Sequence, residues 1–174
     1  QLVALFNGVG GGAAAIVALL ELRAANTPGF LIAVAFTIFI GSVSFAGSVI
    51  TFAKLQEMMT TRPVIFAGQR YVMVILAALT LAGAVLVVLD GDLLIATLLL
   101  VVGLAMGLLL VLPVGGADVP IVISLLNAMT GLAVAASGLV LNNTLLLVAG
   151  TLVGASGTIL TRAMAKAMGR SVNN

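Results

Sequence analysis

The chain has 174 residues, of which 63% are hydrophobic and 7% are charged, and its mean hydropathy is +1.37. A water-soluble domain of this composition would aggregate, so the chain is predicted to lie in a lipid bilayer. It contains no cysteine and no histidine, which excludes disulfides, thiol chemistry and the side chain that most often transfers protons or binds metals. We therefore expect no metal site.

Six apolar segments follow one another along the chain, each near the ~20 residues that cross ~30 Å of hydrocarbon. They cover residues 2–24, 30–53, 70–89, 92–112, 119–141 and 144–168. Turn-forming residues separate them, among them Pro28-Gly29, Asp90-Gly91-Asp92 and Asn142-Asn143, and all but one of the connections are short. The sequence predicts an all-α fold, a polytopic transmembrane bundle of six helices that run alternately up and down.

The charged residues indicate how such a bundle is oriented. If the segments alternate, one face carries Gln1, the 54–70 linker, Asp118 and the C-terminal Arg162, Lys166 and Arg170, whereas the other carries Asp90 and Asp92. The positive-inside rule makes the first face cytoplasmic. The isoelectric point near 9.7 then reflects membrane topology, and no nucleic-acid partner is expected. Lys54 and Glu57 are interpreted as residues of the membrane interface.

The first segment contains a possible nucleotide motif. Gly8-Val-Gly-Gly-Gly-Ala13 fits the dinucleotide fingerprint G-x-G-x-x-A. That fingerprint needs a preceding strand and an acidic residue ~20 positions further on. Glu21 comes too early and the next segment is another membrane span, so we reject a nucleotide site. The glycines instead let a neighbouring backbone pack closely, or loosen the helix beside Asn7.

Four of the segments carry a stripe of small and polar residues. The stripes comprise Asn7, Gly11, Ala14, Ala18 and Glu21; Thr37, Gly41, Ser44, Ser48 and Thr51; Ser124, Asn127, Ala128, Gly131, Ala135 and Gly138; and Gly150, Gly154, Gly157, Thr158 and Thr161. We expect the first, second, fifth and sixth helices to surround a narrow polar interior, with the third and fourth outside toward lipid. Ordinary close packing of small residues is the alternative for the stripes of the second and sixth helices, and it is our interpretation of the pairs Gly103/Gly107 and Gly150/Gly154.

Two amides and one carboxylate are the most informative polar residues. Asn7 and Asn127 are expected to be functional, because an amide in hydrocarbon needs several partners and can relay a hydrogen-bonded water chain. Asp118 has two interpretations. It caps the fifth helix, with Val119 and Pro120 in the first turn, or it pairs with a cation on a soluble partner.

Several stretches together resemble one protein family. They are Gly115-Gly-Ala-Asp118-Val-Pro-Ile-Val-Ile-Ser124-Leu-Leu-Asn127, Gly47-Ser48-Val-Ile-Thr-Phe-Ala-Lys54-Leu, Gly154-Ala-Ser-Gly157-Thr-Ile-Leu and Lys166-Ala-Met-Gly169-Arg170-Ser171. They are similar to the membrane domain of the beta subunit of proton-translocating NAD(P) transhydrogenase. In that family the complex moves a hydride from NADH to NADP+ on soluble domains while protons flow inward through this domain.

The resemblance implies a domain organisation and a set of partners. Residues 1–168 would form the proton-translocating membrane domain, and residues 169–174 would begin a linker to an NADP(H)-binding domain. NADP(H) and NAD(H) would bind to soluble domains, with no cofactor and no hydride-transfer residue in this segment. The partners would be membrane lipid, the membrane helices of the alpha subunit and the two nucleotide-binding domains, in a homodimer of the whole complex in the inner membrane.

The resemblance also assigns residues by position. Asn127 matches an asparagine of the proton path, Asp118 an acidic residue that faces the NADP(H) domain, and Ser48 a serine of the second helix. With the polar stripe residues, the predicted proton path comprises Asn7, Ser44, Ser48, Ser124, Asn127 and Thr130, and the predicted coupling residues are Asp118, Arg162, Lys166 and Arg170.

Asn7 departs from the family pattern, since many members have a protonatable histidine there. Because asparagine does not titrate, this chain would conduct through water or use an ionisable group from another subunit. Two alternatives stay open at this point. The chain is half of a secondary transporter that binds a small solute, or it is a structural membrane anchor.

Overall fold

The computed structural model describes residues 1–24 and 27–169, and these residues form six long α-helices and no strand. The helices are α1 (Leu2–Glu21), α2 (Pro28–Leu55), α3 (Gln69–Asp90), α4 (Leu93–Val111), α5 (Val119–Val140) and α6 (Thr144–Ala167). Short 3₁₀ turns, Leu22–Ala24 and Gly116–Asp118, follow α1 and precede α5. All six helices are long and apolar enough to cross a membrane. The all-α, six-helix prediction is confirmed, and the predicted helix limits lie close to the observed ones.

Polar residues in the short connections start three of the helices. The Thr27 hydroxyl accepts a hydrogen bond from the Phe30 amide at the start of α2, where Pro28 fills the first turn. The carboxylate of Asp92 accepts one from the Leu94 amide at 2.6 Å. The Asn143 side chain does the same for α6. The residues that the sequence marked as turns therefore also satisfy amides that a helix leaves unpaired at its first turn.

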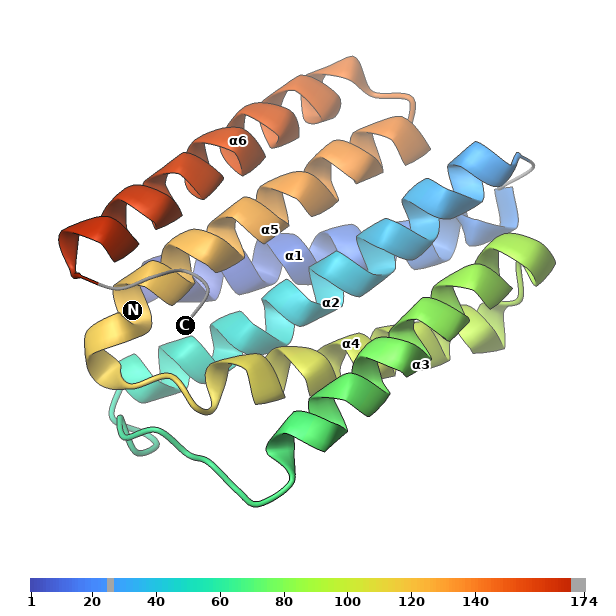
Figure 1. Cartoon of the computed structure of the whole chain (residues 1–174). Helices are drawn as coiled ribbons and strands as arrows, with labels where there is room; N and C mark the ends of the chain where they lie inside the picture. The colour runs from blue at the N-terminus through green and yellow to red at the C-terminus, as the bar shows by residue number, and fades with distance from the viewer. Residues whose placement is uncertain (25–26, 170–174) are drawn as a thin grey trace.

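The helices are arranged around α2, which packs against α1, α4 and α5 and, less extensively, against α3. Figure 1 shows α6 along one edge of the bundle and the α3–α4 pair along the opposite edge. α5 lies between α6 and the α1–α2 pair. The molecule is thus a row of packed helices with α1, α2 and α5 in contact at its centre.

The expectation that α1, α2, α5 and α6 enclose one interior is wrong in two respects. Among the described residues, α6 makes an extensive contact with α5 only, and α4 packs broadly against α2 instead of lying outside toward lipid. Gly103 and Gly107 explain the position of α4, since a Cβ atom on Gly103 would stand 3.3 Å from the carbonyl oxygen of Phe39. Only α3, whose buried residues are Thr80 and Val87, is an outer helix as expected.

Small residues bring two other helix pairs into backbone contact. A Cβ atom on Gly131 of α5 would lie 2.5 Å from the backbone nitrogen of Gly154 on α6. A Cβ atom on Gly11 of α1 would lie 2.9 Å from the carbonyl oxygen of Gly41 on α2. Close packing therefore accounts for the glycines of the stripes, as is common between membrane helices.

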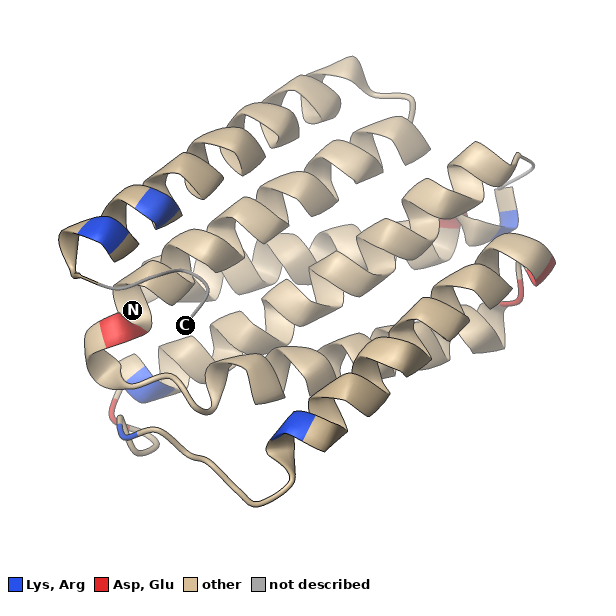
Figure 2. Cartoon of the chain, in the orientation of Figure 1, with Lys and Arg blue, Asp and Glu red and all other residues tan. Residues whose placement is uncertain are grey.

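The charged residues gather at the two ends of the bundle (Figure 2). The end at which α1, α3 and α5 begin and α2, α4 and α6 end carries Lys54, Glu57, Arg62, Arg70, Asp118, Arg162 and Lys166. The opposite end carries Glu21, Arg23, Asp90 and Asp92. Arg170 lies outside the described residues. The alternation assumed for the charge argument is found in the structure, and we call the first of these ends the basic end.

Candidate functional site

Asn7, Ser44 and Thr130 meet where α1, α2 and α5 touch, and we call them the central group. The Ser44 and Thr130 hydroxyl oxygens are 2.6 Å apart. Ser44 Oγ also lies 3.1 Å from the carbonyl oxygen of Leu126, and Thr130 Oγ1 lies 3.1 Å from the carbonyl oxygen of Asn7. The Asn7 amide donates to the carbonyl oxygen of Ile123 at 3.4 Å. Polar contacts therefore link three helices in a bundle that is otherwise largely apolar.

The two hydroxyls of the central group have two protons to donate but make three hydrogen-bond contacts. Each hydroxyl donates once, yet Ser44 and Thr130 share three contacts that need a donor. In one arrangement Thr130 donates to Ser44, which donates to Leu126. In the other, Ser44 donates to Thr130, which donates to Asn7. Rotation of both hydroxyls converts one arrangement into the other without moving a helix.

The surroundings hold this pair in place. The Ser44 side chain is fully buried, and a Cβ atom on Gly11 would stand 3.0 Å from its Cβ atom. A Cβ atom on Gly10 would stand 3.2 Å from the methyl carbon of Thr130. A hydrogen bond in such a low-dielectric setting is stronger than in water, and an unsatisfied hydroxyl there is costly. Two glycines of α1 thus pack closely against the pair on the side that faces α1.

Ser48 lies one turn nearer the basic end than Ser44, on the same face of α2. It is fully buried, and its hydroxyl oxygen has no hydrogen-bond partner among the described residues. A Cβ atom on Gly8 would stand 3.0 Å from the Ser48 Cβ atom, so the residue faces α1. Ser48 therefore points toward the helix that carries Asn7, without joining the hydrogen bonds of the central group.

Ser124 belongs to a second polar group, on the other side of α5. The Thr161 hydroxyl of α6 donates to Ser124 Oγ at 3.0 Å or to the Gly157 carbonyl oxygen at 2.8 Å, and Ser124 lies 3.3 Å from the same carbonyl. We call Ser124 and Thr161 the lateral group. Thr161 was not among the predicted path residues, although its place on the helix-6 stripe, four residues after Gly157, was the signal that could have found it.

A cavity of about 920 Å³ opens at the basic end and reaches the lateral group. Its wall includes Arg62 from the α2–α3 connection, Asp118 from the α4–α5 loop, and Thr161 and Ala165 from α6. Thr161 is both a lining residue of this cavity and the hydrogen-bond partner of Ser124. The cavity therefore joins a charged mouth to a polar contact within the membrane-spanning helices.

Asn127 lies between the two groups along α5, one turn after Ser124 and one turn before Thr130 and Gly131. Its side chain is partly exposed, and no hydrogen bond of it is found among the described residues. The helical spacing places it between the face of α5 that packs on α6 and the face that meets α1. The structure thus divides the predicted path residues into a central and a lateral set, with Asn127 between them and Ser48 beside the first.

Three of the predicted coupling residues, Asp118, Arg162 and Lys166, lie at the basic end. Asp118 is half-buried and lines the cavity, and Arg162 and Lys166 are exposed on the last turns of α6. Asp118 stands at the N-cap position of α5, with Val119 and Pro120 in the first turn, but its carboxylate makes no capping hydrogen bond. Asp118 therefore stands both at the start of α5 and in the cavity wall, and its pairing with a soluble partner stays a prediction.

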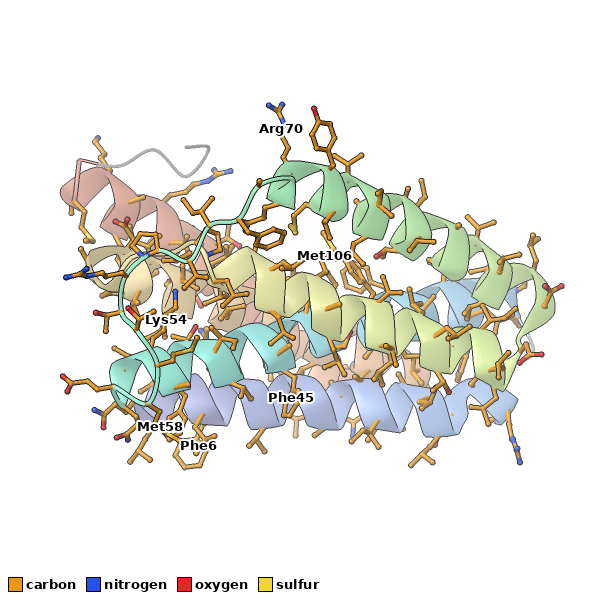
Figure 3. All side chains as sticks on the ribbon, turned by 90° about the horizontal axis from the view of Figure 1, so that it is seen from below. Phe6, Phe45, Lys54, Met58, Arg70 and Met106 are labelled. Atoms are coloured by element: carbon orange, nitrogen blue, oxygen red, sulfur yellow. The ribbon has the colours of Figure 1, made fainter. Side chains whose placement is uncertain are left out.

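Lys54 corrects one expectation. It was interpreted as an interfacial residue, yet it is 1% exposed and its ammonium group lies among backbone carbonyls of the end of α4 and of the loop after it. Figure 3 shows it inside the bundle at the basic end.

As for metal sites, the described part of the chain has no group of three or more acidic, histidine or cysteine side chains that could bind a metal ion.

Six apolar spans with polar side chains at their central contacts define a polytopic helical membrane protein. Over residues 1–174 the chain matches the family model described as NAD(P) transhydrogenase beta subunit. It is 39% identical over 184 aligned residues to the NAD(P) transhydrogenase subunit beta of Rhodospirillum rubrum, and equally so to that of a designated strain of the same organism. The chain belongs to the NAD(P) transhydrogenase beta-subunit family, as its motifs predicted. The match covers 100% of this chain and 40% of those relatives.

Proposed function

We propose that this chain is the proton-conducting membrane domain of an NAD(P) transhydrogenase, coupling inward proton movement to hydride transfer from NADH to NADP+ on soluble domains. The observation that carries the proposal is the central group, in which two hydroxyls with two alternative donor arrangements link three membrane helices. Polar groups at this depth are expensive, and they are characteristic of proton and ion pathways.

The two hydroxyl arrangements suit a proton relay. When Ser44 passes its proton to a water beside the Leu126 carbonyl, Ser44 takes the proton of Thr130 and Thr130 takes one from the Asn7 side. The pair then ends with its polarity reversed. A second proton follows only after both hydroxyls rotate back. The group has no side chain that titrates near neutral pH, so it transmits protons and does not store them. We infer that a water, or an ionisable group of a neighbouring subunit, supplies the proton at Asn7.

The cavity at the basic end suits the exit of protons to the cytoplasmic side. Asp118 and Thr161 both line this cavity, and the Thr161 hydroxyl is hydrogen-bonded to Ser124 of α5. Water that fills the cavity would therefore be separated from Ser124 only by the Thr161 hydroxyl. Asn127 then lies between this group and the central group, where its amide donates and accepts at once. For inward movement the proposed path is therefore the central group, Asn127, the lateral group and then the cavity.

Coupling to hydride transfer is proposed to act at the basic end. Asp118, Arg162, Lys166 and Arg170 would contact the NADP(H)-binding domain, to which residues 169–174 would lead. NADP(H) occupancy would change which arrangement of the path is favoured, so that both processes proceed as one cycle. The further partners proposed are lipid, the alpha-subunit membrane helices and the NAD(H)-binding domain, in a dimeric complex of the inner membrane.

The test uses the full-length enzyme reconstituted in vesicles. Ser44→Ala and Thr130→Val each remove one of the two hydroxyls, and each is expected to lower the rate of coupled proton uptake by about tenfold or more. Nucleotide binding to the soluble domains should stay unchanged. Thr97→Val is the matched control, because the Thr97 hydroxyl is exposed on α4 and bonds to the Leu93 carbonyl of its own helix.

Proton uptake at the wild-type rate in both central-group variants would contradict the proposal. If uptake instead depends on an added small solute and not on the nucleotides, the chain acts as a secondary transporter.

A further inference from the structure

Lys54 ends α2 in an environment that is unusual for lysine. Its side chain is 1% exposed, and its ammonium group donates to the carbonyl oxygens of Val111 at 3.1 Å, Leu112 at 2.7 Å and Val114 at 2.7 Å. All three donors of the ammonium group are therefore used on backbone acceptors. A lysine at a membrane interface normally extends its charged end toward water. Lys54 does the opposite and turns its charge inward.

The three acceptors belong to the C-terminal end of α4 and the loop after it. α4 ends at Val111, and the last carbonyls of a helix lack partners within the helix. They also carry the negative end of the helix dipole, which favours a cation. Lys54 thus caps α4 from a different helix, α2.

The same loop is fastened to the α2–α3 connection by backbone hydrogen bonds. The Val64 amide donates to the Leu112 carbonyl at 3.0 Å, and the Gly116 amide donates to the Thr61 carbonyl at 2.9 Å. The loop runs on through the short turn Gly116–Asp118 into α5. Two chain segments that contribute to the cavity wall at the basic end are therefore tied together, and Lys54 ties one of them, the end of α4 with the loop after it, to α2.

We propose that Lys54 is a positioning residue that clamps residues 111–118 onto the end of α2 and so makes the position of Asp118 depend on the position of α2. Ser44 and Ser48 lie on the same helix, with Ser44 about 15 Å from Lys54 at the helical rise. A rigid helix transmits a displacement at one end to the other. This inference rests on the proposed function, and it adds the physical connection between the coupling residues and the central group.

The experiment compares Lys54→Met, which keeps the length and loses the donors, with Lys54→Gln, which keeps two donors. Arg70→Met is the matched control, because it removes an exposed cation at the same end of the bundle. Amide hydrogen exchange is measured on the full-length enzyme in detergent, at Val64 and Gly116. Protons taken up per hydride transferred are measured in vesicles.

We expect exchange at Val64 and Gly116 to accelerate about tenfold in Lys54→Met and less in Lys54→Gln, with the proton-to-hydride ratio falling in the same order. Arg70→Met should change neither quantity. Unchanged exchange in Lys54→Met overturns the clamp. Faster exchange with an unchanged ratio overturns its role in coupling.

Failure of the proposed function would appear differently, as wild-type proton uptake in the Ser44 and Thr130 variants. If Lys54→Met does not fold, the comparison of Lys54→Gln with wild type decides the same question by the same two measurements.

Discussion

The central and lateral groups use the same chemistry in two different settings. Each contains one serine and one threonine whose hydroxyls share hydrogen bonds with each other and with helix carbonyls. The central pair lies where three helices meet and packs closely against glycines of α1, whereas the lateral pair joins only α5 and α6 and its Thr161 lines an open cavity. The difference between the two groups is access to water. Water in the cavity can replace a lost hydroxyl of the lateral group, whereas the residues that line this cavity include neither Ser44 nor Thr130.

The largest expected effect comes from breaking the close helix packing beside the central group. Gly41→Ala would place a Cβ atom 2.5 Å from the carbonyl oxygen of Gly11. We expect the free energy of unfolding to fall by about 1–3 kcal/mol, because overpacking forces the two backbones apart. Unfolding in detergent, followed by circular dichroism, measures the change.

Gly29→Ala is its matched control, since it adds the same methyl group to the same helix where no heavy atom lies within 4 Å. Equal stability of the two variants would show that the α1–α2 contact tolerates expansion.

Chemical labelling sharpens the difference in water access. The chain has no cysteine, so each introduced thiol is unique within it. Thr161→Cys should react with a membrane-impermeant maleimide added at the basic end, because Thr161 lines the cavity. Thr130→Cys should react at least about tenfold more slowly, since a thiolate does not form readily in an apolar site. Equal labelling rates, read by mass spectrometry of the full-length enzyme, would remove the distinction between the two groups.

A smaller effect is expected from comparing the hydroxyls in proton uptake. Thr161→Val should lower the coupled rate by about threefold, against about tenfold or more for Thr130→Val, because cavity water bonds to Ser124 when Thr161 does not. Both rates come from vesicles at equal protein content. A greater loss for Thr161→Val than for Thr130→Val would reverse the roles assigned to the groups.

The smallest effect is expected at Ser48, beside the central group. Its buried hydroxyl has no hydrogen-bond partner among the described residues, so Ser48→Ala removes a desolvated polar group and loses no hydrogen bond. The free energy of unfolding should rise by up to about 1 kcal/mol or stay unchanged. A clear decrease would indicate that the Ser48 hydroxyl binds a water in the folded protein.

The sequence predicted helices well because hydropathy and length are properties of single segments. It also placed Ser44 and Thr130 in one polar set, and the structure brings them to 2.6 Å. Pairing of helices was harder, because Gly103 and Gly107 on α4 look like the glycines of any membrane contact. Their partner surface on α2 is apparent only once both helices are placed.

Two features depended on tertiary structure alone. The predicted path residues split into two groups because α5 carries polar residues on more than one face, and a single stripe on a helical projection does not separate those faces. Lys54 was misplaced because the sequence shows a lysine at a helix end and does not show that the end of α4 stands beside it. Both errors concern which neighbour a side chain meets.

The hydrogen bond between Thr130 and the Asn7 carbonyl joins residues 123 positions apart. During synthesis, α1 to α4 enter the membrane before α5 supplies Thr130, so a growing chain holds Ser44 without its partner. Closing so long a separation is also slow compared with forming the neighbouring α5–α6 hairpin. The central group consequently forms after the α5–α6 hairpin, and a chain that has not yet formed it lacks the proposed relay through which the membrane potential could discharge.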